Sequence, residues 1–203
     1  MAAQPKPFIS EEAYLVQERD SLVKHEYYNG EIFAMSGGTE AHSLIAGNAH
    51  AALHSQLRRR DCRVYQSDMR IKVQQTGLNT YPDVTIVCGQ PQFTDEARDT
   101  ILNPVLIIEV LSPSTERYDR GMKFQNYRTI DTLQDYIIIA QDHHHIEHYS
   151  RQETGQWLLN EVVGSEATLD IPTLQCHLTL EDVYEKVEFV PEQPRITRDI
   201  AAT

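Results

Sequence analysis

Two carboxylates stand inside segments that otherwise have the pattern of buried β-strands. Asp83 lies in TYPDVTIVCG (80–89), and Glu109 lies in VLIIEVLSPSTERYDRGMKFQNY (105–127). Burying a carboxylate is costly unless it is paired, hydrogen-bonded or bound to a metal ion. A single acid of this kind is most simply a strand-end residue that backbone N–H groups or an arginine satisfies. Two acids on adjacent strands bring four oxygen atoms toward one point, which suits Mg²⁺ or Mn²⁺, and such an ion activates water against a phosphodiester.

The elements that must position these acids follow from local patterns. Residues 39–60 carry apolar side chains along one helical stripe, and 119–130 has the pattern of a second helix. The segments CRVYQSDMRIKV (62–73), YPDVTIVCG and PVLIIEVLS predict three strands. LQDYIIIA (133–140) predicts a fourth, parallel to an earlier strand because a helical crossover precedes it. The expected fold is α/β (α+β): a mixed sheet flanked by helices, in the order helix, three strands, helix, strand.

Shorter elements flank this core, which we place at about residues 20–150. In ISEEAYLVQE, Ser10 lies ahead of two acids as a helix cap, and Asn29-Gly30 predicts a hairpin in KHEYYNGEIFAMSG. HIEHYS and QWLLNEVV predict a C-terminal hairpin, and Thr179 caps a short closing helix. We find no repeat or long linker, so we expect one domain over 1–203, with 192–203 as a flexible tail.

Composition narrows the class of protein. The chain has 203 residues, 40% of them hydrophobic, and no apolar run reaches the roughly 18–20 residues of a spanning helix. The polar N-terminus lacks the core of a signal peptide, so we expect a cytoplasmic protein with no membrane partner. Three widely spaced cysteines argue against both a disulfide framework and a thiolate zinc site. We expect them to be reduced, with Cys88 a small core residue.

A net charge of −12 argues against a nucleic-acid partner, since phosphate binding normally leaves a basic surface. The charge is unevenly distributed, however: residues 58–72 hold six Arg or Lys against two acids. Arg58, Arg59 and Arg60 could grip phosphates, although basic residues are also expected at the end of a helix on dipole grounds. Net charge alone therefore does not decide the partner.

The pattern around the two acids resembles the PD-(D/E)XK nuclease superfamily, which has a Pro-Asp in one strand and an acid in a later apolar strand. YPDVTIV, PVLIIEVLSPST, YDRGMKFQNY and LQDYIII resemble its Uma-two family of restriction endonucleases over about residues 20–150. The resemblance implies a restriction-endonuclease-like core in which Asp83 and Glu109 hold Mg²⁺ or Mn²⁺. It also implies a lysine two residues after Glu109, where this chain has Leu111.

Lys123 is the closest substitute, and the family pattern places a lysine there. Asp119, Lys123 and Tyr127 are spaced i, i+4, i+8 and therefore share one helix face. An ordinary surface Asp–Lys pair beside a half-buried tyrosine would give the same spacing. The apparent metal site next to it favours a catalytic Lys123, with Tyr127 as an additional candidate.

Helix 39–60 supplies two more candidates. Glu40 lies near its start, where the superfamily often contributes an acid, although the helix dipole also favours an acid there. His42 matches a position that the family usually fills with histidine. Asp68 is a weaker candidate on the first strand.

The histidines allow a different chemistry. DHHHIEHYS places His143 and His145 on the same side of a strand, with His144 and His148 close by, so a zinc or nickel site is an alternative. No HExxH motif accompanies them, and a polar turn leading into an exposed strand is the simpler interpretation. Motifs for nucleotide cofactors and for a serine nucleophile elbow are absent from the sequence.

Two functions remain open at this point. One is a metal-dependent endonuclease acting on DNA, with Asp83 and Glu109 on the ion and Lys123 assisting. The other is a catalytically inactive protein of the same fold that binds nucleic acid or a protein partner. We expect a homodimer, since two sites must meet the two antiparallel strands of a duplex and two-fold symmetry is the commonest closed assembly.

Overall fold

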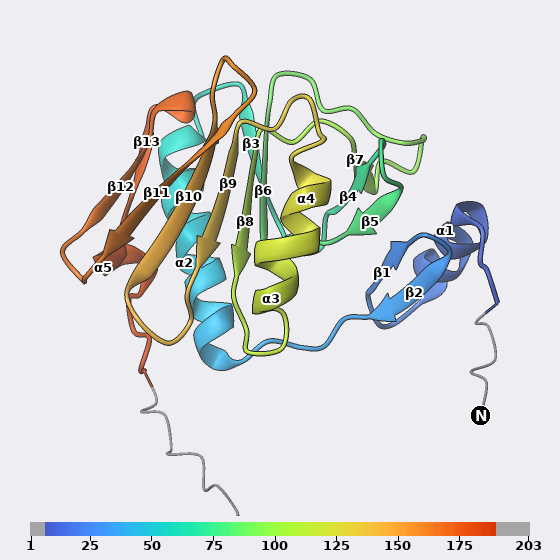
Figure 1. Ribbon diagram of the computed structural model, residues 1–203, viewed down its shortest axis with the longest axis horizontal. Coiled ribbons are helices and arrows are strands. Elements are labelled where there is room, and N and C mark those ends of the chain that lie inside the picture. The colour runs from blue at the N-terminus through green and yellow to red at the C-terminus, as the bar shows by residue number, and fades with distance from the viewer. Residues whose placement is uncertain (1–6, 190–203) are drawn as a thin grey trace, which may run out of the picture.

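A six-stranded mixed sheet forms the centre of the molecule (Figure 1). The computed structural model describes residues 7–189, so the tail expected at 192–203 lies outside the described residues. The strand order is β11-β10-β9-β8-β6-β3. The strands are β3 (Cys62–Gln66), β6 (Val84–Cys88), β8 (Leu106–Val110), β9 (Asp135–Ile139), β10 (His145–Arg151) and β11 (Trp157–Val163). Only the β8–β9 pair of this sheet is parallel, which confirms the crossover predicted between them.

Helices cover both faces of this sheet. Helix α2 (Glu40–Leu57) lies behind it in Figure 1, and α3 (Glu116–Tyr118), a π-helical turn (Asp119–Lys123) and α4 (Phe124–Tyr127) lie in front. Side chains alternate along β8, so Ile108 packs into the core beneath α2, while Ile107 packs into the core beneath α3 and α4. Glu109 is two residues after Ile107, so its side chain lies on the same face of β8 and points toward α3 and α4.

The sequence explains why α2 forms where it does. Thr39 caps its first turn by accepting a hydrogen bond from the His42 backbone N–H at 3.2 Å. The predicted stripe of Ile45, Ala49, Leu53 and Leu57 is buried. This stripe sets the rotation of the helix about its axis. His42, in the first turn of α2, then lies at the end of the sheet where Asp83 lies.

A second sheet contains five short strands in the order β2-β1-β5-β4-β7. Its members are β1 (His25–Tyr28), β2 (Glu31–Ala34), β4 (Arg70–Val73), β5 (Leu78–Thr80) and β7 (Thr100–Ile101). The single strand predicted over 62–73 is therefore wrong. A turn at Gln66–Met69, closed by the Met69 N–H on the Gln66 carbonyl at 3.0 Å, sends its two halves into different sheets.

The N-terminal elements follow their predicted signals. Ser10 accepts a hydrogen bond from the Ala13 N–H at 3.2 Å and caps α1 (Glu11–Asp20). The β1–β2 hairpin turns at Asn29 (φ 49°) and Gly30 (φ 82°). Both residues have positive φ, as a tight hairpin turn of this length requires, which is why Asn-Gly occurs here.

The C-terminal elements pack over α2. They are β12 (Thr168–Ile171), a 3₁₀ turn (Pro172–Leu174), β13 (Cys176–Thr179) and α5 (Leu180–Val183). Thr179 caps α5 by accepting from the Asp182 N–H at 3.1 Å, as predicted. Within residues 7–189, no helix is both long enough and apolar enough to cross a membrane.

A buried arginine ties the second sheet together. Arg70 is 2% exposed; it donates to the Tyr81 hydroxyl at 2.9 Å and to Thr100 at 2.8 Å, and it lies 3.2 Å from Asp99. Asp99 also pairs with Arg19 of α1 at 2.8 Å. Asp99 therefore links the N-terminal helix to the sheet that packs against the front helices.

We expect Asp99→Asn to lower stability at pH 7 but not near pH 2. The hydrogen bond from Arg19 lowers the pKa of Asp99 from 3.8 to about 2. Its folded pKa lies below the unfolded one, so the stabilisation is present above about pH 4 and is lost as the pH falls toward 2. Since the pair is about one-third exposed, we expect a loss of about 1 kcal/mol after solvent screening.

Urea titrations at several pH values measure this difference. Asp131→Asn, a change at an exposed acid, is the matched control and should leave the midpoint unchanged throughout. A gap between wild type and Asp99→Asn that stays constant down to pH 2 would contradict the ion-pair account.

Candidate active site

Asp83 lies at the start of β6, level with the end of β8. The antiparallel register places Val84 opposite Ile108, so the preceding Asp83 reaches the last residues of β8. Its Oδ2 accepts a hydrogen bond from the Val110 N–H at 2.7 Å and lies 3.3 Å from His42 Nε2. The predicted proximity of the two acidic strands is therefore confirmed, and Asp83 has the fixed orientation that a ligand requires.

Glu109 meets the helix that covers its face of the sheet. Its Oε1 lies 2.9 Å from Lys123 Nζ and accepts a hydrogen bond from the Tyr127 hydroxyl at 2.6 Å. Asp119 Oδ1 lies 3.4 Å from the same ammonium. The i, i+4, i+8 face predicted for Asp119, Lys123 and Tyr127 therefore points inward at Glu109. All of these side chains are almost completely buried.

Burial dominates the electrostatics of this group. It raises the pKa of Glu109 to about 8, although the charge of Lys123 opposes the shift. Burial likewise raises the pKa of Asp119. Burial alone would lower the pKa of Lys123, but Glu109 and the neighbouring acids outweigh it, so its pKa lies well above 10.5 and the ammonium persists. A buried positive charge is thus held permanently beside Glu109.

His42 is the second cationic group at the site. Its hydrogen bond to Asp83 is the main cause of a raised pKa, which burial opposes, and a hydrogen bond to the Val110 backbone adds to the rise. The imidazole therefore gains its proton more readily than a free histidine. Positive charge is favoured at the point that Asp83 and the end of β8 share.

These residues line one cavity of about 900 Å³. Its walls come from the β1–β2 hairpin, the start of α2 with the preceding loop 35–39, and the loop 112–115 after β8. Four acids line it, Glu26, Asp83, Glu109 and Asp119, together with two lysines and two histidines, Lys24, Lys123, His42 and His50. Carboxylate oxygens are the ligands that hard divalent cations prefer, so the donor set fits Mg²⁺ or Mn²⁺.

Comparison with known proteins identifies the chain. Residues 11–181 match the model of a family described as "Putative restriction endonuclease". The chain belongs to the Uma2 family. Two relatives from Synechocystis sp. are the uncharacterized proteins slr1290, 34% identical over 91% of this chain and 96% of the relative, and sll1609, 36% identical over 77% and 89%.

A crystal structure from Anabaena variabilis, described as "a putative nuclease belonging to DUF820", has the same fold. It superposes with a TM-score of 0.67 and 18% identity, covering 84% of this chain and 94% of its own. The predicted restriction-endonuclease-like fold and the predicted family are therefore confirmed. Membership of Uma2 indicates a nuclease.

The resemblance to the PD-(D/E)XK superfamily implied a lysine at position 111, where the structure has a core leucine. Leu111 is 5% exposed and packs in the core cluster beneath α3 and α4, on the same face as Glu109. Lys123 reaches that face from the covering helix instead.

Two predicted acids lie outside this cavity. Glu40 is the first residue of α2 but is exposed and absent from the cavity wall. Asp68 is 73% exposed and pairs with Lys24 at 2.6 Å in the turn between β3 and β4. The structure therefore brings His42 and Tyr127 to the acid pair but not Glu40 or Asp68.

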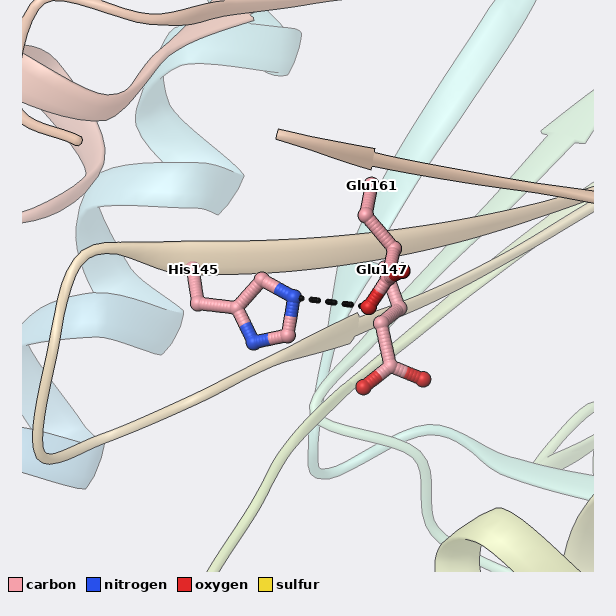
Figure 2. A group of neighbouring side chains, drawn as sticks. All are labelled: His145, Glu147 and Glu161. Atoms are coloured by element: carbon pink, nitrogen blue, oxygen red, sulfur yellow. Dashed lines mark hydrogen bonds and ion pairs between the residues drawn. The ribbon is translucent and has the colours of Figure 1, made fainter. Parts of the chain in front are cut away.

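The histidines of the segment 143–148 do not form one cluster but contact different residues. His148 is buried against Asp135 at 2.7 Å, while the rings of His143 and His145 stack at 5.4 Å. His145 also lies with Glu147 and Glu161 on β10 and β11, where one ligand atom from each residue is within 4.8 Å of the others (Figure 2).

This second group is a possible metal site of mixed nitrogen and oxygen donors, yet Glu147 already has partners. Its Oε1 pairs with Arg120, and its Oε2 accepts from the Tyr149 hydroxyl at 2.9 Å. A cation there would have to displace Arg120, whereas the Asp83–Glu109 cavity offers two acids that face a common space.

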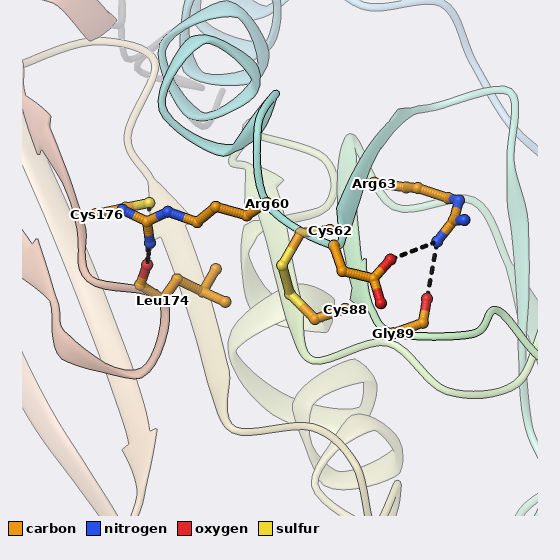
Figure 3. The surroundings of a disulfide bond; sticks show 8 residues. Arg60, Cys62, Arg63, Cys88, Gly89, Leu174 and Cys176 are labelled. Carbon is orange, nitrogen blue, oxygen red and sulfur yellow. Dashed lines mark hydrogen bonds and ion pairs between the residues drawn. A yellow bond between two sulfur atoms is a disulfide. The ribbon is translucent and has the colours of Figure 1, made fainter.

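The arginines predicted to grip phosphates follow the far end of α2. The 18-residue helix is about 27 Å long, so they are far from His42 near its start. Arg60 donates to the carbonyls of Leu174 and Gln175 and has a structural role (Figure 3). Arg58 and Arg59 are exposed, and their phosphate contacts stay a prediction.

The cysteine prediction is wrong for one pair. Cys62 and Cys88 lie directly opposite each other on β3 and β6 and form a disulfide (Figure 3). Cys176 is free and buried, in line with the expected reduced thiol. The pair is 26 residues apart, and only the β3–β6 register brings the two sulfur atoms together.

Sequence reasoning missed Glu26. This residue lies on β1, and its Oε1 is 3.3 Å from Lys123 Nζ. Nothing local distinguishes Glu26 from the other polar residues of the hairpin, because its place in the cavity depends on how the second sheet docks against the front helices. A charged residue in the centre of a short strand was the one available signal.

Proposed function

We propose that this Uma2 protein is a metal-dependent endonuclease that hydrolyses phosphodiester bonds in DNA. The observation that carries the proposal is the 2.9 Å contact between Lys123 Nζ and Glu109 Oε1 in the cavity that Asp83 also lines. An acid pair and one permanent ammonium are the groups that phosphodiester hydrolysis requires. Here they converge although the lysine is not at its usual sequence position.

Asp83 and Glu109 are the residues that would hold Mg²⁺ or Mn²⁺. When bound, the ion would polarise the phosphodiester and supply an activated water. Hydrogen bonds from Val110 and Tyr127 orient the two carboxylates before any ligand arrives. The negative cavity would otherwise repel phosphate, so the cation also explains how a protein of net charge −12 accepts DNA.

Lys123 would act on the water or on the phosphate. A protonated amine has no lone pair for a hard cation, so Lys123 cannot be a ligand while its pKa stays high. Its ammonium can orient the attacking water and stabilise the charge that develops on the phosphate oxygens. His42, 3.3 Å from Asp83, would contact the same phosphate.

The second candidate is a catalytically inactive protein of this fold that binds nucleic acid or a protein partner. The displaced lysine favours it, since Leu111 occupies the superfamily position and is built into the core. The acidic charge also favours it. The cleavage assay below separates the two candidates, because an inactive protein nicks no DNA under any metal condition.

We also propose a cytoplasmic location, since a DNA nuclease would meet its substrate there. Cytosolic thiols are normally kept reduced. In that compartment Cys62 and Cys88 would exist as neighbouring thiols.

The first prediction separates the acids from the lysine. Asp83→Asn and Glu109→Gln each remove a charge facing the ion, so metal affinity and cleavage should fall together. Lys123→Ala should leave Mg²⁺ or Mn²⁺ affinity nearly intact while cleavage falls by about 10²–10³-fold. Lys123→Arg should restore cleavage only in part, because the planar guanidinium group is a poor substitute for a compact ammonium.

Calorimetric metal titration and a plasmid-nicking assay measure the two effects. Lys186→Ala, at a lysine whose side chain is 81% exposed, is the matched control and should behave as wild type. Wild-type cleavage by Lys123→Ala would rule out the lysine mechanism. A wild type that never cuts, with or without Mn²⁺, would favour the inactive candidate.

The second prediction concerns assembly. A nuclease that cuts both strands of a duplex needs two sites related by a two-fold axis, so we propose a homodimer. Light scattering at micromolar concentration should give about twice the chain mass of 23.3 kDa. A single species at the chain mass, both with and without duplex DNA, would contradict this proposal.

A further inference from the structure

Glu26 enters the cavity from a different sheet than the acid pair. It lies on β1, and its side chain is 12% exposed. The carboxylate accepts a hydrogen bond from the Thr80 hydroxyl on β5 and interacts with the Tyr118 hydroxyl of α3. Two neighbours on separate elements therefore fix Glu26 in one orientation, with Oε1 3.3 Å from Lys123 Nζ.

Three carboxylates surround the Lys123 ammonium. Glu109, Glu26 and Asp119 lie 2.9, 3.3 and 3.4 Å from Nζ. Asp119 Oδ1 has no hydrogen-bond partner among residues 7–189 and acts on the ammonium through its charge, whereas Glu109 and Glu26 are the two closer carboxylates. The three acids come from β8, from β1 and from the π-helical turn, and together they restrict a side chain that otherwise has four flexible bonds.

We propose that Glu26 is a positioning residue that, with Asp119, holds the Lys123 ammonium against Glu109. The catalytic part of this inference rests on the proposed function, whereas the restraint on Lys123 does not. Glu109 alone would fix one donor and leave the ammonium free to swing about that contact. Glu26 supplies a second contact to the ammonium from the other sheet, so the β1–β2 hairpin contributes to the site.

Glu26→Gln tests the inference, because it keeps the size of the side chain and an acceptor oxygen but removes the charge. The structure predicts that hydrogen exchange of the Lys123 ammonium, followed by ¹H–¹⁵N NMR of ¹⁵N-lysine-labelled protein, will be at least tenfold faster than in wild type. Lys123→Met identifies the resonance. Plasmid nicking should fall by about 10–100-fold, the scale of a misplaced catalytic group, while Mn²⁺ affinity stays within about twofold.

The control is Glu12→Gln, the same change at an exposed acid of α1, which should alter neither exchange nor nicking. Unchanged Lys123 exchange in Glu26→Gln would overturn the inference, whether or not the wild type cuts DNA. A wild type that does not cut would overturn the proposed function alone, since the exchange rates still decide the positioning role.

A second variant covers the case in which Glu26→Gln does not fold. Tyr118→Phe removes the hydroxyl that interacts with the Glu26 carboxylate and leaves the charge in place. It should raise the Lys123 exchange rate by about threefold, since Glu26 loses one of the two neighbours that orient it. No change in exchange in this variant would overturn the inference in the same way.

Discussion

The buried ammonium of Lys123 is the group on which the arrangement of this protein depends. Its side chain is 6% exposed, and an unpaired charge at that depth would cost several kcal/mol. The fold compensates by directing three carboxylates at it from separate elements. Each of these elements must then dock in one way: the front helices over β8, and the β1–β2 hairpin against those helices. The ionic group of Lys123 and its three carboxylates thereby specifies how the two sheets pack against each other.

Apolar packing supplies the stability that a buried ionic group does not provide. One core cluster lies between α2 and the six-stranded sheet, and another lies between that sheet, the front helices and the second sheet. The second cluster surrounds the ionic group with Leu111, Tyr127, Tyr136 and their neighbours. This low-dielectric setting raises the pKa of Glu109 to about 8 and strengthens every charge interaction in the cavity. The same packing that makes an ionised carboxylate energetically costly therefore also strengthens its attraction to a bound cation.

The acidic character of the protein is consistent with a nuclease once the charges are located. Four acids face the cavity, where a divalent cation would neutralise them, while the basic residues 58–60 follow the far end of α2. A substrate that binds through a metal ion does not need a broad basic surface beside the reacting phosphate. Net charge influences solubility and long-range attraction, whereas the charges that line the cavity determine which reaction it can support.

The sequence by itself determined the elements with local causes, among them the two buried strands beside Asp83 and Glu109. Caps at Ser10, Thr39 and Thr179, the Asn29-Gly30 turn and the apolar strands around Asp83 and Glu109 depend on residues within a few positions of one another. Those predictions were confirmed for that reason.

The tertiary structure decided what depends on distant residues. It divided 62–73 between two sheets, joined Cys62 to Cys88 through strand register, and left Glu40 outside the cavity. It also brought Glu26 to Lys123, which is 97 positions later in the sequence. No local pattern encodes such a contact, because it forms only when two separately built layers pack together and bury a charge that neither could satisfy alone.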